Sequence, residues 1–260
     1  MSWVRVPLVT PPTITLFTTM PAETTVHAGI FFFMIPQAAL LREYIAQGEH
    51  QQQDFKYKID DAPKLARSVS AFANTDGGRL LIGVRDDGSV HGVRSEEEIF
   101  MMHAAARKYC TPVPTIQFET LQVPTAPHGG RLRTVVICTV MPSRQRPVFA
   151  LDVDDEQSTS RTAYIRVADE NIVASPIHLA IWRQEQRLQG EAFADTDEER
   201  ILLKALNAHP QGLTLNQLLK VAKPTSVARP LAITLLARFI RFGLALITLR
   251  ERQWILLPNE

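Results

Sequence analysis

Residues 48–56 read GEHQQQDFK and residues 70–88 read SAFANTDGGRLLIGVRDDG. The alternation of polar and aromatic residues around the first stretch predicts a strand over Gln51–Lys58. In the second stretch, a helix end is followed by the polar turn Asn74–Gly78, where paired glycines permit a tight reversal. The near-continuous apolar run after this turn predicts an interior strand over Arg79–Arg85. Two strands on either side of one helix indicate a mixed α+β arrangement.

Working outward from these stretches, helices and strands continue in both directions. Asp60 and Asp61 are good N-cap residues, and Pro63 suits the first turn of the central helix. Ser95 with Glu98 three residues later predicts a capping box that opens another helix. The other predicted elements are helices over Gln37–Gly48 and Pro176–Leu188, strands over Ser89–Val93, Thr115–Val123, Leu132–Val140 and Ala163–Val167, a hairpin turn at Asp86–Gly88 and a polar loop over Asp152–Ser160.

The last part of the chain shows a different order of elements. Three helices are predicted there, and a capping box of Thr214 and Gln217 opens the second. Two strands follow, over Leu244–Leu249 and Gln253–Leu257, around a charged turn. Three helices followed by a hairpin is the order of a winged helix-turn-helix. We therefore expect a mixed sheet with flanking helices plus a small C-terminal winged helix-turn-helix domain.

Length and composition support two domains. The chain has 260 residues. We divide it into an N-terminal extension at 1–35, whose order the sequence does not determine, the α+β domain at 36–189 and the winged domain at 197–260. The hydrophobic share of 45% and the charged share of 21% are typical of soluble globular proteins. They exclude collagen-like, low-complexity and largely disordered chains.

Charge, cysteine and hydropathy patterns limit the partners. The formal net charge is +1, but residues 197–260 carry nine Lys and Arg against five Asp and Glu, a basic tail suited to an anionic partner. Cys110 and Cys138 stand alone, without a CxxC pair, which excludes a zinc ribbon and suits a reducing cytoplasm. The apolar run at 28–36 is shorter than the roughly 18 residues of a membrane span. We expect a cytoplasmic protein with no membrane partner.

Four charged residues are the first candidate site. Asp54 and Lys56 are two positions apart on one predicted strand, so their side chains share a face. Glu49 lies just before that strand, and Asp86 follows the next strand. Converging carboxylates favour a hard cation between them, and a lysine beside them can neutralise a phosphate oxygen. The spacing therefore suggests Glu49, Asp54, Lys56 and Asp86 as catalytic residues and the three acids as metal ligands; the alternative is a solvated strand face.

Two further groups are candidates for binding phosphates. At the first, backbone N–H groups of the Gly-Gly turn could hold a phosphate of a nucleotide or nucleic acid, through Asn74, Thr75, Gly77 and Gly78. The alternative is a simple helix stop, and no GxxxxGK[ST] motif accompanies the turn. At the second, arginines on the third helix of the tail could neutralise DNA phosphates, namely Arg229, Arg238 and Arg241. The alternative is a winged helix that contacts only protein.

These motifs together resemble the Schlafen AlbA-like domain family. The resemblance rests on Glu49 followed by Asp54-Phe55-Lys56, on the AFANTDGG run at 71–78, on Leu81–Val84 and on Asp86–Gly88. It implies a nucleic-acid-binding domain, often labelled a divergent AAA ATP-binding protein. Some eukaryotic Schlafen members are RNA endonucleases that use three acids, which correspond here to Glu49, Asp54 and Asp86. The chain departs from the family pattern at Asp54, where a glutamate is usual, and at Arg85, where an acid is common.

The resemblance and the basic tail lead to one main expectation and two alternatives. We expect a nucleic-acid-binding protein, acting in transcription regulation, with DNA or RNA as its partner. The first alternative is a divalent-metal-dependent endoribonuclease that uses Mg²⁺ or Mn²⁺. The second is an ATP-binding protein without a P-loop. The sequence leaves open the choice between DNA and RNA and whether the chain forms a homo-oligomer.

Overall fold

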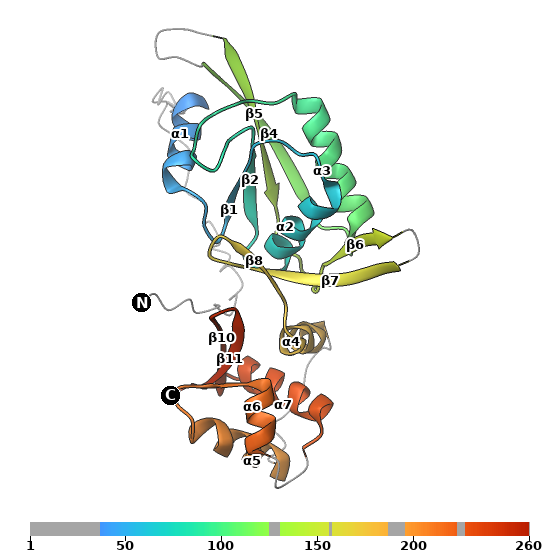
Figure 1. The fold of residues 1–260 in the computed structure, drawn as a ribbon, viewed down its shortest axis with the longest axis vertical. Helices are drawn as coiled ribbons and strands as arrows, with labels where there is room; N and C mark the ends of the chain where they lie inside the picture. The colour runs from blue at the N-terminus through green and yellow to red at the C-terminus, as the bar shows by residue number, and fades with distance from the viewer. Residues whose placement is uncertain (1–36, 125–130, 156–157, 187–195, 223–226, 260) are drawn as a thin grey trace, which may run out of the picture.

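The computed structural model describes residues 37–124, 131–155, 158–186, 196–222 and 227–259 (Figure 1). The predicted extension at 1–35 lies outside the described residues. Three sheets organise the rest of the chain. Two of them belong to the N-terminal unit, by which we mean residues 37–173, and the third belongs to the C-terminal unit, residues 197–259.

The first sheet has the strand order β1-β2-β5-β4 and is mixed, as predicted. Strands β1 and β2 are parallel, and the other neighbours are antiparallel. The elements of this layer are α1 (Gln37–Gln47), β1 (Gln53–Lys56), α2 (Ala62–Asn74), β2 (Gly78–Ile82), α3 (Ser95–Tyr109), β4 (Ile116–Pro124) and β5 (Leu132–Val140).

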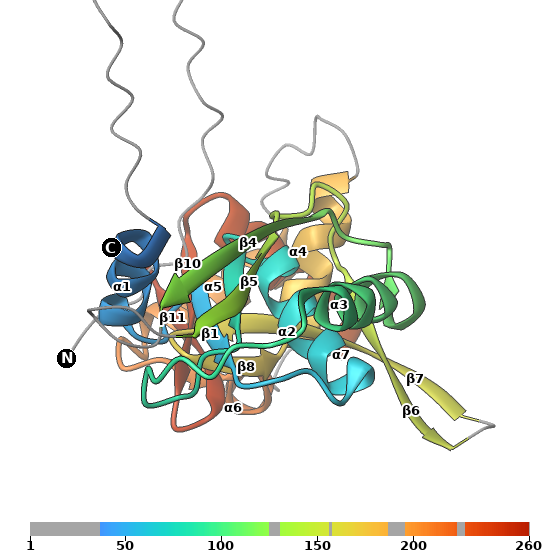
Figure 2. The same cartoon turned by 90° about the horizontal axis from the view of Figure 1, so that it is seen from above.

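Both faces of this sheet are covered by helices, and the side chains of β2 show how. Leu80 and Ile82 pack in the core that α2 and α3 form, whereas Leu81 packs in a second core with Leu41 of α1. Figure 2 shows the sheet between α1 on one side and α2 and α3 on the other. Because both faces are buried, the strand is a continuous apolar run. Phe55 of β1 lies in the α1 core, so its neighbours along the strand face α2.

The second sheet has the order β3-β6-β7-β8 and packs across α2. Its strands are antiparallel: β3 (Cys110–Thr111), β6 (Phe149–Asp155), β7 (Ser158–Val167) and β8 (Glu170–Val173). The polar loop predicted over Asp152–Ser160 is wrong, because β6 continues to Asp155 and β7 begins at Ser158, antiparallel to it. Pairing between the two strands satisfies the backbone groups, so the segment forms strands without an apolar pattern.

The C-terminal unit contains the three helices and two strands that the sequence predicted, in that order. Its elements are α5 (Asp197–Asn207), β9 (Leu213–Thr214), α6 (Leu215–Val221), α7 (Arg229–Arg241), β10 (Ala245–Arg250) and β11 (Gln253–Pro258). The strands form a sheet of order β10-β11-β9. Thr214 and Gln217 form the predicted capping box. The two-residue strand β9 was not predicted, because it is too short to show a period.

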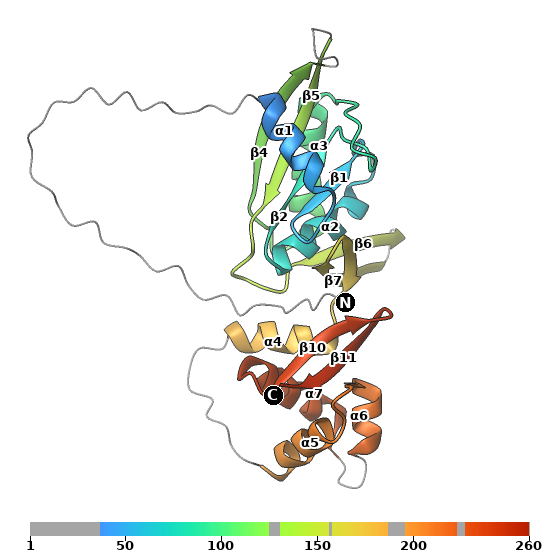
Figure 3. The same ribbon diagram turned by 90° about the vertical axis from the view of Figure 1, so that its left-hand side faces the viewer.

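Helix α4 (Pro176–Gln186) joins the two units (Figure 3). Its residues Ile177 and Ala180 lie in the C-terminal core, while Trp182 packs with Ala163 and Ile165 of β7. The hairpin of β10 and β11 also reaches the N-terminal unit, where the Trp254 indole N–H donates to the Val173 carbonyl at 3.1 Å. The hairpin therefore docks against β8.

One predicted cap is wrong. Arg94 stands at the N-cap of α3, and its side chain makes no capping hydrogen bond, in place of the expected box of Ser95 and Glu98. The Glu98 carboxylate instead accepts a hydrogen bond from the Ile59 backbone N–H at 3.0 Å, across to the start of α2. Ile59, which is distant in sequence, therefore binds the Glu98 carboxylate that a local capping box would have used. In the described part of the chain, no helix has the length and apolar character of a membrane span.

Candidate functional site

Three of the four residues of the predicted acidic site come together at β1. Asp54 and Lys56 lie on the α2 face of the strand, as their spacing predicted, and the Lys56 ammonium is 2.6 Å from Asp54 Oδ2. The Glu49 carboxylate reaches along the same strand and accepts a hydrogen bond from the Phe55 N–H at 2.8 Å. Asp54 is buried, with 4% of its surface exposed, whereas Lys56 is about one-third exposed.

Proximity of the two carboxyl groups shifts their pKa values in opposite directions. Burial, the hydrogen bond with Asp54 and its negative charge raise the pKa of Glu49 to about 7. Burial alone would raise the pKa of Asp54. The hydrogen bond from Glu49 and the charges of Lys56 and Arg166 outweigh it and hold that pKa below its usual value. Below about pH 7, the pair therefore holds one proton, which lies mainly on Glu49, while Asp54 is the ionised partner.

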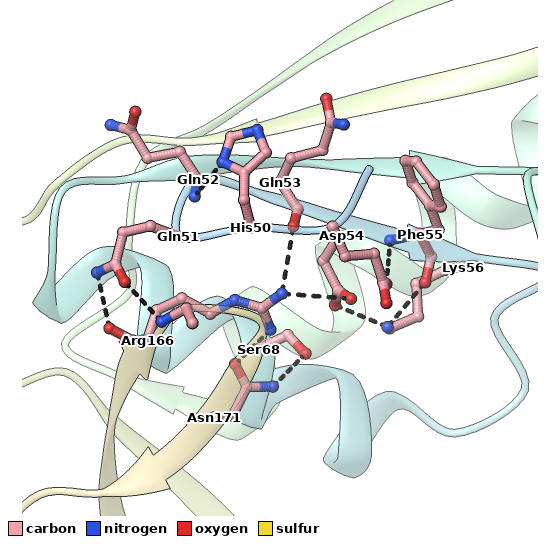
Figure 4. Close-up of polar contacts among 12 residues, drawn as sticks. His50, Gln51, Gln52, Gln53, Asp54, Phe55, Lys56, Ser68, Arg166 and Asn171 are labelled. Atoms are coloured by element: carbon pink, nitrogen blue, oxygen red, sulfur yellow. Dashed lines mark hydrogen bonds and ion pairs between the residues drawn. The ribbon is translucent and has the colours of Figure 1, made fainter. Parts of the chain in front are cut away.

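A buried arginine that the sequence analysis missed completes this cluster. Arg166 of β7 is 2% exposed, and its guanidinium lies 3.6 Å from Asp54 Oδ1 (Figure 4). It also donates to the Gln53 carbonyl at 3.2 Å and to the Asn171 side chain at 3.0 Å. Asn171 in turn donates to Ser68 of α2. The sequence did contain a signal for it, because Arg166 is a charged residue inside the otherwise apolar strand predicted over Ala163–Val167.

Asp86 does not join the acid pair. It lies in the exposed turn after β2, and no hydrogen bond or ion pair of the described residues links it to Glu49 or Asp54. No group of three His, Cys, Asp or Glu side chains in the described ranges is placed to hold a metal ion. The predicted three-carboxylate cluster is therefore not formed. The reason is that the chain leaves the sheet after Ile82, turning at Gly83 with a φ of +101°.

The turn at 74–78 is occupied by contacts within the protein. Asn74 is 2% exposed; its side chain donates to the carbonyls of Val148 and Tyr164 and accepts from the Val148 N–H. Thr75 accepts from the Arg166 N–H, and the Gly77 N–H donates to the Phe72 carbonyl. These groups connect the end of α2 to β7 and to Val148, and Asn74 and Gly77 do not offer the phosphate-binding donors that the sequence suggested.

Glycine is required at this turn for steric reasons. Gly77 has a φ of +71°, and a Cβ atom there would lie 2.8 Å from the Val140 carbonyl oxygen. At Gly78, the same atom would lie 2.4 Å from the Phe72 ring. The pair of glycines thus allows α2 to pack closely on β2 and β5.

The three arginines proposed for the third helix of the tail have different environments. Arg238 forms an ion pair of 2.8 Å with Glu199 of α5, whose side chain is fully buried. Arg241 donates to the Gln184 side chain of α4 at 3.4 Å. Arg229 is exposed at the start of α7 and donates to the Asn216 side chain. Of the three, only Arg229 is exposed; the other two are partly buried and hold α7 against neighbouring helices.

The acid pair offers a partial set of ligands for a divalent cation. Asp54 Oδ2 is buried, and the Lys56 ammonium lies 2.6 Å from it, so that one positive charge already faces this oxygen. Two carboxylates fit Mg²⁺ or Mn²⁺ with most of its water shell retained, which is a common mode for Mg²⁺. Lys56 is placed to neutralise a phosphate oxygen at the same spot.

Comparison with known proteins supports one domain assignment. Residues 49–175 match the family model described as Schlafen, AlbA_2. This match supports a Schlafen AlbA-like domain in that part of the chain, in agreement with the resemblance of its motifs. No curated protein matches the chain. Among solved structures, the DIP2311 protein from Corynebacterium diphtheriae is similar at 21% identity and a TM-score of 0.35, over 61% of this chain and 30% of that chain.

Proposed function

We propose that this chain binds nucleic acid through its Schlafen AlbA-like domain and acts in transcription regulation. The observation that carries the proposal is the family match over residues 49–175, since an AlbA-like domain suggests nucleic-acid binding in a general sense. Lys56, about one-third exposed beside the buried Asp54, supports it, because an ammonium in this position can contact a backbone phosphate.

The C-terminal unit supports the regulatory part of the proposal. Its order α5-β9-α6-α7-β10-β11, with a sheet of order β10-β11-β9, is the order expected of a winged helix-turn-helix. In this proposal the start of α7, with Arg229, contacts the nucleic acid. The hairpin has another role, because Trp254 and Arg252 bind Val173 and Glu170 of β8.

Titration of the full chain with fluorescently labelled duplex DNA and single-stranded RNA tests the proposal. We expect binding at about 50 mM salt that weakens steadily as salt is added, because phosphate contacts release counterions. Absence of binding to both probes at this salt concentration would contradict the proposal. Binding that is insensitive to salt would contradict the phosphate contacts.

A second candidate function is a divalent-metal-dependent endoribonuclease. The specific observation in its favour is the Glu49–Asp54 pair, in which the pKa of Glu49 is raised to about 7 beside the Lys56 ammonium. Glu49 and Asp54 would hold a Mg²⁺ or Mn²⁺ ion, which supplies charge neutralisation at a scissile phosphate when bound. Lys56 would contribute positive charge from the protein side.

Incubation of labelled RNA with the protein and Mn²⁺ tests this second candidate. We expect Asp54→Asn to abolish cleavage, while Asp86→Asn cleaves at the wild-type rate because Asp86 is outside the pair. Equal cleavage by Asp54→Asn and the wild type would exclude the proposed site. Loss of cleavage in Asp86→Asn as well would show that all three acids act together.

A further inference from the structure

The turn that carries Asp86 also carries a cation stacked on an aromatic ring. The Arg85 guanidinium carbon lies 4.8 Å from the centroid of the Tyr57 ring. On the same ring, the Tyr57 hydroxyl is hydrogen-bonded to His91 Nε2 at 3.1 Å, with the two ring centroids 4.5 Å apart. Tyr57 follows β1 directly, whereas Arg85 and His91 lie on either side of the turn after β2. Three residues from two chain segments thus form one small surface.

Backbone hydrogen bonds fix the turn in place. The Arg85 N–H donates to the Ser89 carbonyl at 3.0 Å, and the Gly88 N–H donates to the Arg85 carbonyl at 2.8 Å. At the base of the turn, the His91 N–H donates to the Gly83 carbonyl at 2.8 Å. The positions of Arg85 and His91 are therefore set before any ligand binds, which lowers the entropy lost on binding.

The exposure of this surface suits a flat ligand. Arg85 is exposed, and the Tyr57 beneath it is 36% exposed, so that the guanidinium plane is accessible to solvent. Asp86 and Asp87 are exposed next to Arg85 and would repel a phosphate. A neutral planar group with a π-face meets no such repulsion. Nucleobases have this chemistry, and they stack on aromatic rings and on arginine planes.

We propose that the Arg85–Tyr57 pair is a stacking site for an unpaired nucleobase, so that the N-terminal unit prefers single-stranded nucleic acid. A base inside a duplex is already stacked on both faces and cannot occupy the site. His91 acts as a positioning residue that holds the Tyr57 ring through its hydroxyl. This inference rests on the proposed nucleic-acid binding and adds the class of strand that is bound. Because every base has a π-face, the site tolerates many sequences.

Fluorescence anisotropy with the full chain tests the stacking site. The probes are a labelled single-stranded DNA, a single-stranded RNA of the same sequence and a DNA duplex of that sequence. Arg85→Lys keeps the positive charge but removes the planar guanidinium group. We expect the affinity for single strands to fall roughly tenfold, within the range measured when one base-stacking side chain is lost. Tyr57→Leu should have a similar effect and Tyr57→Phe a smaller one. Arg94→Lys is the matched control, because Arg94 is exposed and pairs only with Glu97 among the described contacts.

The possible results separate this inference from the proposed function. If the wild type binds no probe, both are overturned. If the wild type binds but Arg85→Lys and Arg94→Lys both bind single strands as tightly as the wild type, the stacking site is overturned and nucleic-acid binding stands. An equal loss on the duplex would also overturn it, because stacking affects unpaired bases only. Comparing the DNA and RNA strands shows which of the two the site prefers.

Discussion

The two units of this chain use their charged residues in opposite ways. In the N-terminal unit, Glu49, Asp54 and Lys56 gather at the α2 face of β1, with Lys56 still open to solvent. In the C-terminal unit, which has the more basic sequence, Arg238 and Arg241 are used to hold α7 against α5 and α4. The net charge of a segment therefore does not show where its binding surface lies. Burial and partner residues decide which charges are available.

The largest effect is expected where an arginine is structural. Arg238→Ala would leave Glu199 buried without its ion pair, and we expect the free energy of unfolding to fall by about 3–5 kcal/mol. Urea unfolding of the full chain measures this change. A loss below about 1 kcal/mol, the value of a surface ion pair, would show that Arg238 is available for binding after all.

A smaller effect is expected at the contact between the two units. Trp254→Phe removes the hydrogen bond to the Val173 carbonyl but keeps an aromatic ring near His178, so that stability should fall by about 1 kcal/mol. The unfolding transition measured by urea gives this value. An unchanged urea midpoint would indicate that this hydrogen bond does not hold the hairpin on β8. The hairpin would then be a candidate for contact with nucleic acid.

The pH dependence of stability probes the acid pair. Glu49 keeps its proton to about pH 7 in the folded chain, but loses it near its usual pKa of 4.5 when unfolded. Between these values the folded state binds more protons, so the free energy of unfolding falls as pH rises from about 4.5 to 7. Glu49→Gln cannot ionise and should flatten this part of the profile. Parallel profiles for the two proteins would show that the carboxyls are not coupled.

The smallest effect on stability is expected at the exposed arginine of α7. Arg229→Ala should change the free energy of unfolding by no more than about 0.5 kcal/mol, because only an exposed contact with Asn216 is lost. In the DNA titration, Arg229→Ala should reduce the slope of log affinity against log salt concentration by about one, the value for one lost phosphate contact. Unchanged affinity and salt dependence would remove α7 from the proposed surface.

Much of the fold was predictable because its signals are local. The cap at Asp61, the stop of α2 and the apolar run of β5 depend on residues near one another in the chain. The shared face of Asp54 and Lys56 also follows from strand geometry alone. The failed capping box at Ser95 had a different origin, because the Ile59 N–H, from another part of the chain, binds the Glu98 carboxylate. The strand residues within 152–160 pair with each other, and their polar sequence has no apolar period from which strands could be predicted.

The sequence by itself determined most of the helices, the strands β1, β2, β4, β5, β10 and β11, and the shared face of Asp54 and Lys56, because periodicity and turn chemistry act over a few residues. It did not predict β3, β6, β8 or β9, and the strand that it predicted over Ser89–Val93 is wrong, because only an isolated bridge between Val84 and Val90 forms there. Only the tertiary structure decided that Arg166 lies beside Asp54, that Asp86 lies in an exposed turn and that Arg238 pairs with the buried Glu199. These outcomes depend on which segments meet after β7 crosses α2 and α7 packs on α5. Contacts between distant segments, such as those of Arg166 and Arg238, produce no regular spacing in the sequence, so they could not be predicted from it.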